Sequence, residues 1–331
     1  MKRPLLVFAG QSNMEGAPAL PPKDIFELEN SYEYLHKPRR FGAHMGVFKK
    51  NAYPAGEFSY IDMKEAYGDG ASVDAVSSLA NYTEHTFFSP AMSNADDVEK
   101  KTIVPFQVYS EADFNWGPTV APMFARELER CGYICAYAHI AKGGVPVEHY
   151  LGGDATDYFL EKSADFFSDS EKFFPDDDTS ERILLWHQGE ADPYKGYAYY
   201  KDALHKLWES AKSIGFTKFF IFRVGYWGCV EIADIMRAQE DFCKEVDEAY
   251  IITRAASFFE YPGQDTSDWF AEPIADEYKL CRDSFYGFDN NHINEKGFQV
   301  LAKHAVPNAV RIIFEDKEPL LEKENILPLI D

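Results

Sequence analysis

Basic residues are scarce in this sequence relative to acidic ones. Lysine and arginine total 33 and aspartate and glutamate total 55 among 331 residues, which gives a formal net charge of −22 at pH 7. Nucleic acids and anionic membrane surfaces repel such a chain, so we expect neither as a partner. A highly acidic polymer is disfavoured as a substrate for the same reason, unless a local basic pocket overrides the overall field.

Cysteines are few, and no long apolar run is present. The five cysteines form no Cys-x-x-Cys pair, so neither a disulfide framework nor a zinc site is predicted; they are Cys131, Cys135, Cys229, Cys243 and Cys281. No apolar stretch reaches the roughly 18 residues needed to span a bilayer. Met1 leads almost directly into an apolar run, so we expect no signal peptide and a cytoplasmic protein.

The chain alternates short apolar runs with segments of helical periodicity. Five runs are predicted to be strands: Arg3–Ala9, Tyr133–Ile140, Ile183–His187, Lys218–Val224 and Ala249–Ala255. Helices are predicted over Pro118–Cys131, Asp157–Phe174, Tyr197–Ile214, Ile232–Val246 and a C-terminal segment that ends before Pro307. This alternation implies a parallel sheet covered on both faces. The predicted fold class is therefore α/β, a three-layer α/β/α sandwich with a five-stranded parallel sheet, in a single domain over residues 1–331.

One long segment does not fit a minimal sandwich. About 100 residues lie between positions 12 and 117, and structureless loops of that length are uncommon in compact domains. We therefore predict an aromatic-rich insertion at about 30–115 that packs over the functional site. Its rings either form the insertion's own core or offer flat apolar platforms for sugar rings. The tail after about residue 316 is predicted to be a surface extension.

The first of three informative motifs is GQSNM, at Gly10–Met14. Ser12 lies just past the carboxyl end of the first predicted strand and close to a helix start. Its hydroxyl can project from the sheet edge there, beside backbone N–H groups that can face an anion. That geometry suits a nucleophile. The alternative, which this motif taken alone favours, is that Ser12 only caps the helix.

The second motif is WHQGEAD, at Trp186–Asp192, which begins at the end of another predicted strand. The amide of Gln188 and nearby backbone N–H groups can donate hydrogen bonds to the negative oxygen of a tetrahedral intermediate, and one such donor is typically worth about 3 kcal/mol of barrier. His187 is interpreted as a buried structural histidine rather than a base.

The third motif is DNNH, at Asp289–His292, which lies in a loop before the C-terminal helix. A histidine takes a proton from serine efficiently only if its other nitrogen is held and its charged form is stabilised. A carboxylate three residues earlier can do both. Taken alone, this motif favours a purely structural role in a turn and helix cap. It is much less expected that all three motifs have only structural roles.

Together the three motifs resemble the blocks of the SGNH hydrolase superfamily, in particular its carbohydrate esterase branch, which includes acetylxylan esterases and sialate O-acetylesterase domains. The resemblance implies Ser12 as nucleophile, His292 as base and Asp289 as its orienting acid. It also implies an oxyanion hole made of the N–H groups of Ser12 and Gly117 and the side chain of Gln188. The serine is not in a Gly-x-Ser-x-Gly elbow, because Met14 stands where that motif has its second glycine, so an α/β-hydrolase is set aside.

A further segment, AKGGVPVEHY from Ala141, is similar to a loop near the family's active site, although Val145 stands where relatives have a small hydroxyl residue. As substrate contacts we consider Gln11, Trp116, Glu190 and Trp227, with Glu190 favoured as a brace of the site.

The resulting prediction is a serine esterase that removes O-acetyl groups from a small-molecule or oligosaccharide substrate and needs no cofactor or metal. The alternatives are a serine hydrolase of another ester class, lipid or thioester, and a catalytically inactive carbohydrate-binding relative. The sequence predicts no oligomeric state.

Overall fold

The computed structural model describes residues 1–16, 27–35, 87–92, 119–152, 154–225, 232–259, 284–286 and 292–330. Within these ranges a seven-stranded sheet has the strand order β3-β2-β4-β1-β5-β6-β7. Its strands are β1 (Leu5–Gly10), β2 (Glu27–Leu35), β3 (Phe87–Met92), β4 (Ala136–His139), β5 (Arg182–His187), β6 (Lys218–Phe222) and β7 (Ala249–Thr253).

The five predicted strands form the middle and one side of this sheet. β4, β1, β5, β6 and β7 are neighbours in that order and pair in parallel. This is the doubly wound order in which ligands bind beyond the carboxyl ends of the strands, next to the first strand. The predicted α/β sandwich is therefore confirmed.

The prediction of five strands is wrong in number, because two more strands extend the sheet on the β4 side. β2 pairs in parallel with β4, and β3 pairs antiparallel with β2 at the outer edge. Both belong to the segment between the first motif and residue 119. This segment includes the proposed insertion at about 30–115, most of which lies outside the described residues. Pro90 lies within β3, and proline is tolerated in a sheet mainly at such an edge because it lacks an N–H group.

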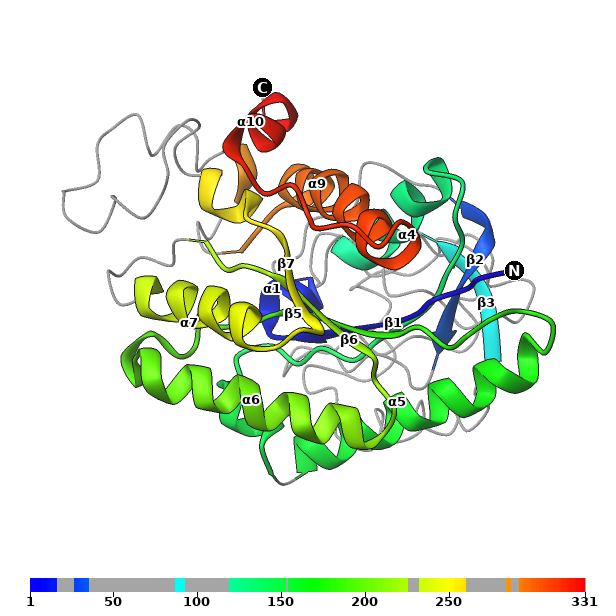
Figure 1. The fold of residues 1–331 in the computed structure, drawn as a ribbon, viewed down its shortest axis with the longest axis horizontal. Helices are drawn as coiled ribbons and strands as arrows, with labels where there is room; N and C mark the ends of the chain where they lie inside the picture. The colour runs from blue at the N-terminus through cyan, green and yellow to red at the C-terminus, as the bar shows by residue number, and fades with distance from the viewer. Residues whose placement is uncertain are drawn as a thin grey trace, which may run out of the picture.

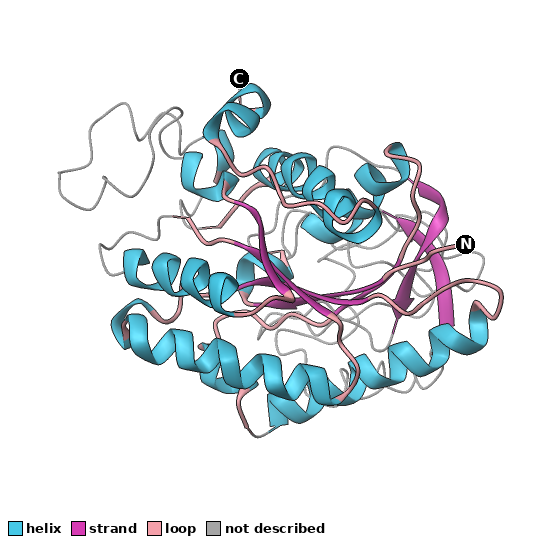
Figure 2. Ribbon diagram, in the orientation of Figure 1, coloured by secondary structure: helices cyan, strands magenta, loops and turns pink. Residues whose placement is uncertain are grey.

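Helices cover both faces of the sheet (Figures 1 and 2). One face carries α4 (Val120–Arg130) and α9 (Glu295–Phe314), and the other carries α5 (Asp154–Phe173), α6 (Tyr197–Ser213) and α7 (Ile232–Glu245). Alternate residues of β1 divide between the two cores: Leu6 packs with α4 and α9, and Leu5 packs with the α5–α7 layer. This division explains why the strands read as continuous apolar runs. No helix in the described ranges is long and apolar enough to cross a membrane.

Short helices occupy the connections. They are α1 (Ser12–Glu15), α10 (Lys323–Ile326) and the 3₁₀ helices η3 (Val147–Tyr150), η4 (Pro193–Lys195), η5 (Ala255–Phe258) and η7 (Leu327–Leu329).

The C-terminal region differs from the sequence prediction in two ways. Helix α9 does not end before Pro307 but continues to Phe314, because residues beyond the proline, including Ile312 and Ile313, are buried in the core and stabilise the second half of the helix. The tail after residue 316 is docked rather than a plain surface extension. The Asn308 side chain is hydrogen-bonded to the backbone of Leu320, and Ile326 is fully buried.

Candidate active site

Ser12 lies where β1 ends against β5. Gly10 has a φ of +139°, and a Cβ atom at this position would lie 2.1 Å from the carbonyl oxygen of His187, so only glycine fits between the two strand ends. The chain then turns directly into α1, whose first residue is Ser12. The Tyr150 hydroxyl donates to the Gly10 carbonyl at 2.7 Å, and a ring nitrogen of His139 lies 2.6 Å from the Met14 carbonyl oxygen. The serine turn, residues 10–16, is thus anchored from two sides.

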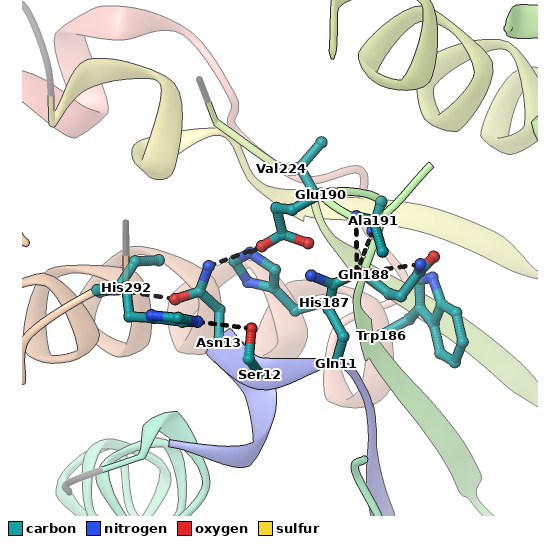
Figure 3. Close-up of polar contacts among 12 residues, drawn as sticks. Gln11, Ser12, Asn13, Trp186, His187, Gln188, Glu190, Ala191, Val224 and His292 are labelled. Carbon is teal, nitrogen blue, oxygen red and sulfur yellow. Dashed lines mark hydrogen bonds and ion pairs between the residues drawn. The ribbon is translucent and has the colours of Figure 1, made fainter. Parts of the chain in front are cut away.

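His292 lies beside this turn although it is 280 positions away in the chain. Its Nε2 atom is 2.9 Å from Ser12 Oγ, as Figure 3 shows. The histidine precedes α9, whose N-cap Asn294 accepts a hydrogen bond from the Gly297 N–H at 3.1 Å. In the tautomer that carries its proton on Nδ1, His292 can accept the serine hydroxyl hydrogen at Nε2, which is the arrangement of a nucleophile and its general base.

Asn13 joins the serine turn to two other parts of the site. Its Oδ1 accepts a hydrogen bond from the Ile293 N–H at 2.8 Å, and its Nδ2 donates to Glu190 Oε1 at 2.7 Å. Both side chains are buried, with 2% of Asn13 and 5% of Glu190 exposed. The sequence alone indicates no role for Asn13, because its two partners are distant in the chain.

Glu190 is a buried anion rather than a group presented to substrate. Oε1 lies 3.3 Å from His187 Nε2 and also accepts from Asn13. Burial raises the pKa of Glu190, but the hydrogen bonds and charge of His187, together with the bond from Asn13, outweigh this and hold the pKa below its ordinary value. The interpretation of Glu190 as a brace agrees with this geometry, and so does the structural interpretation of His187, whose ring stacks on Phe222.

Gln188 does not present its amide to Ser12, contrary to the prediction from the sequence. The side chain is completely buried, and Nε2 donates to Gln11 Oε1 at 3.1 Å, to the Val145 carbonyl at 3.3 Å and to Asp192. Oε1 accepts from the Tyr200 hydroxyl at 2.9 Å. An amide has only two hydrogens, so these three acceptors leave Gln188 no donor for an oxyanion.

Gln11 has the orientation that was expected of Gln188. Its Oε1 accepts from Gln188 Nε2 and from the backbone N–H groups of Ala191 at 3.1 Å and Gly189 at 3.5 Å. Because the oxygen must face these donors, the amide nitrogen points the other way, toward the side on which Ser12 lies (Figure 3). No acceptor within the described ranges takes a hydrogen bond from this nitrogen. Gln11 is therefore the side chain placed to donate beside the serine.

Asp192 holds the Gln188 side chain in place through a hydrogen bond. It accepts from Gln188 and from the Val147 N–H at 2.9 Å, and burial raises its pKa above the ordinary value. The chain of contacts from Asp192 through Gln188 to Gln11 fixes the Gln11 amide in one orientation. The motif WHQGEAD thus supplies the groups that orient the Gln11 amide, and it does not supply the hydrogen-bond donor beside Ser12.

The loop at Lys142–Val145 lies against the serine turn, as its resemblance implies. A Cβ atom at Gly143 would come within 3.7 Å of Ser12 Cβ and 2.4 Å of Glu15 Oε2, and the Lys142 N–H donates to the Gly10 carbonyl at 3.0 Å. The Val145 side chain is buried in the core on the α5–α7 side.

Four predicted site residues lie outside the described ranges: Asp289, Trp116, Gly117 and Trp227. Among the residues that are described, no three His, Cys, Asp or Glu side chains gather in a way that would hold a metal ion.

Among the comparisons with known proteins, one solved structure shows a shared fold. No family model and no curated protein matches the chain. A solved structure of a protein from Arabidopsis thaliana superposes with a TM-score of 0.54 at 12% identity, covering 95% of this chain and 100% of that one. NanS gives a TM-score of 0.46 at 10% identity, with coverage of 96% and 98%. A carbohydrate acetylesterase from Xanthomonas citri gives 0.42 at 12% identity, with coverage of 92% and 56%. At 12% identity, the likeness to the Arabidopsis thaliana protein shows the fold alone.

Proposed function

We propose that this chain is a serine esterase that removes O-acetyl groups from carbohydrates through an acyl-enzyme intermediate. The observation that carries the proposal is the 2.9 Å contact between His292 Nε2 and Ser12 Oγ. It occurs at the carboxyl edge of a parallel sheet, where such folds bind ligands, and beside an amide nitrogen whose orientation is fixed. A capping serine would need no imidazole at this distance.

The first half of the reaction forms the acyl-enzyme. His292 takes the hydroxyl proton as Ser12 Oγ attacks the ester carbonyl carbon, and the carbonyl oxygen becomes negatively charged. The Ser12 N–H, at the start of α1, and Gln11 Nε2 donate to that oxygen, with Gly117 as a further donor that the sequence resemblance implies. His292 then gives its proton to the departing sugar oxygen, and the acetyl group stays on Ser12.

The second half repeats these steps with water. His292 removes a proton from a water molecule that attacks the acetyl carbon, the tetrahedral intermediate collapses, and the proton returns to Ser12 Oγ as acetate leaves. Asp289 is assigned to orient His292 and to stabilise its charged form, as the motif resemblance implies. In this mechanism His292 takes up one proton and gives up one proton in each half-reaction, first from Ser12 to the sugar oxygen and then from water to Ser12.

The choice of an acetylated carbohydrate rests on the resemblance of the three motifs to the carbohydrate esterase branch. The net charge of −22 favours neutral substrates over polyanionic ones. Trp116 and Trp227 are proposed as sugar platforms because one adjoins Gly117 in sequence and the other follows the end of β6.

A substrate panel tests the proposal. Acetate release is measured from acetylated neutral sugars, acetylated sialate and medium-chain acyl esters, with Ser12→Ala as the matched control. We expect the highest kcat/KM on an acetylated sugar and no turnover by the variant. Preference for the medium-chain esters would move the assignment to a lipid esterase. Sugar binding without acetate release would indicate a binding protein.

A further inference from the structure

The histidine reaches the serine only if two separate segments of chain stay together. Ser12 belongs to the turn after β1, and His292 to the segment that leads into α9. The serine turn is anchored by Tyr150 and His139. The histidine segment is held on its far side by Asn294, whose Nδ2 donates to the Tyr286 carbonyl at 3.0 Å. What fixes the two segments to each other therefore decides the Ser12–His292 distance.

We propose that Asn13 is the positioning residue that clamps the histidine segment onto the serine turn, with Glu190 as its buried anchor. This inference rests on the proposed function, because it assigns Asn13 a role in placing the base. Asn13 is next to the nucleophile, and its Oδ1 receives the N–H of Ile293, the residue next to the base. The side chain of the residue after the proposed nucleophile thus holds the backbone of the residue after the proposed base.

The hydrogen bond to Glu190 fixes the orientation of the Asn13 amide. Asn13 Nδ2 donates to Glu190 Oε1 at 2.7 Å, so the amide cannot flip without placing its oxygen against a carboxylate. The buried charge of Glu190 is in turn stabilised by the hydrogen bond from Asn13. Its Oε2 is buried and meets no donor in the described part of the chain, so Asn13 and His187 are the groups that compensate its charge. A charge-assisted hydrogen bond of this kind is among the stronger ones in proteins.

The hydrogen bond between positions 13 and 190 therefore has a fixed direction, which a pair of mutations can reverse. In the wild type an amide at position 13 donates to a carboxylate at position 190. With Asn13→Asp alone, two carboxyl groups face each other. At a pH high enough to ionise both, neither can donate to the other and the clamp is broken, although the new side chain has nearly the same shape. With Asn13→Asp and Glu190→Gln together, an amide at position 190 donates one hydrogen to a carboxylate at position 13 and the other to His187 Nε2, which accepts it in the tautomer that carries its proton on Nδ1. That carboxylate still accepts the Ile293 N–H, so the clamp is restored.

The experiment compares the wild type, the two single variants and the double variant on an aryl acetate. A displacement of about 1 Å at a reacting group can cost about 10²-fold in rate. We expect Asn13→Asp to lower kcat at least about 10-fold with little change in KM, and the double variant to return to within about 10-fold of the wild type. A folded Asn13→Asp variant with wild-type kcat would overturn the proposal. So would a double variant that is unfolded or no faster than Asn13→Asp, because general destabilisation is not repaired by reversing one hydrogen bond.

A second measurement does not depend on activity. Amide hydrogen exchange of the peptide that contains Ile293 should be slow in the wild type, faster in Asn13→Asp and slow again in the double variant. If the wild type hydrolyses no ester, the proposed function fails while exchange still decides on the clamp. If Asn13→Asp does not fold, exchange in the folded double variant is compared with the wild type, and exchange that is faster by 10-fold or more rejects the proposal.

Discussion

Replacing Gln11 by glutamate changes one atom at the position that matters most for the proposed oxyanion hole. Gln11 Oε1 accepts from Gln188 Nε2 and from the N–H groups of Gly189 and Ala191. A glutamate keeps that oxygen and its three donors. Its second oxygen replaces the amide nitrogen on the side of Ser12, so a hydrogen-bond donor becomes an acceptor while the support around it is preserved.

The expected loss follows from what one donor contributes. Removing a single oxyanion-hole donor typically costs about 10²–10³-fold in kcat, or about 3–4 kcal/mol of transition-state stabilisation. A carboxylate oxygen in place of the donor also repels the negative charge that develops on the substrate oxygen. We therefore expect Gln11→Glu to lower kcat at least about 10²-fold, with KM changed only a few-fold, because the donor acts mainly in the transition state.

The assay is steady-state hydrolysis of an aryl acetate, with thermal unfolding recorded on the same samples. Gln299→Glu, which makes the same chemical change on α9 in a residue without a role in the proposed mechanism, is the matched control and should retain wild-type kcat. A folded Gln11→Glu variant with kcat within about five-fold of the wild type would refute the assignment of Gln11, because no oxyanion donor is that dispensable.

Three further predictions concern stability. Gly10→Ala should lower the free energy of unfolding by about 3 kcal/mol or more, since its φ of +139° and the nearby β5 backbone leave no room for a methyl group; an unchanged urea midpoint would contradict this. Burial lowers the pKa of His304 from 6.5 to about 4, so the unfolded chain binds the proton at a higher pH than the folded chain does. The free energy of unfolding should therefore fall by about 3 kcal/mol as the pH is lowered from 6.5 to 4. A His304→Gln variant, followed by urea titration at each pH, should lack that part of the slope; an identical slope would disprove the assignment. Deleting residues 317–331 should lower the free energy of unfolding by about 3–6 kcal/mol, because Ile326 and Ile330 leave the core. An unaltered melting temperature would show that the docked tail contributes nothing.

The parts of the fold that could be predicted are those in which burial dictates sequence. β1 and β5 lie in the middle of the sheet with helices on both faces, so nearly every residue is apolar and the strands are visible as runs. β3 is the edge strand and carries Pro90, and its neighbour β2 contains several polar residues (ELENSYEYL), so neither has an apolar run that marks it. α9 passes Pro307 because tertiary packing outweighs one missing backbone hydrogen bond, and a local rule does not contain that packing.

The proximity of Ser12 and His292 could be predicted because each residue lies at a recognisable place, a strand end or a helix start. The donor could not. Gln11 and Gln188 are both amides at the ends of neighbouring strands, and which nitrogen faces Ser12 depends on acceptors such as Asp192 that only the folded structure brings together. Asn13 was overlooked for the same reason, since both of its partners come from remote segments.

The most direct test of the account is the mass of the protein after reaction with a fluorophosphonate, with the modified peptide sequenced. An activated serine reacts with such a reagent, and an ordinary capping serine does not. We predict a single adduct on Ser12, absent in Ser12→Ala and formed far more slowly in folded His292→Ala. A folded wild-type protein that forms no adduct, or one that is modified at a different serine, would contradict the claim that His292 activates Ser12.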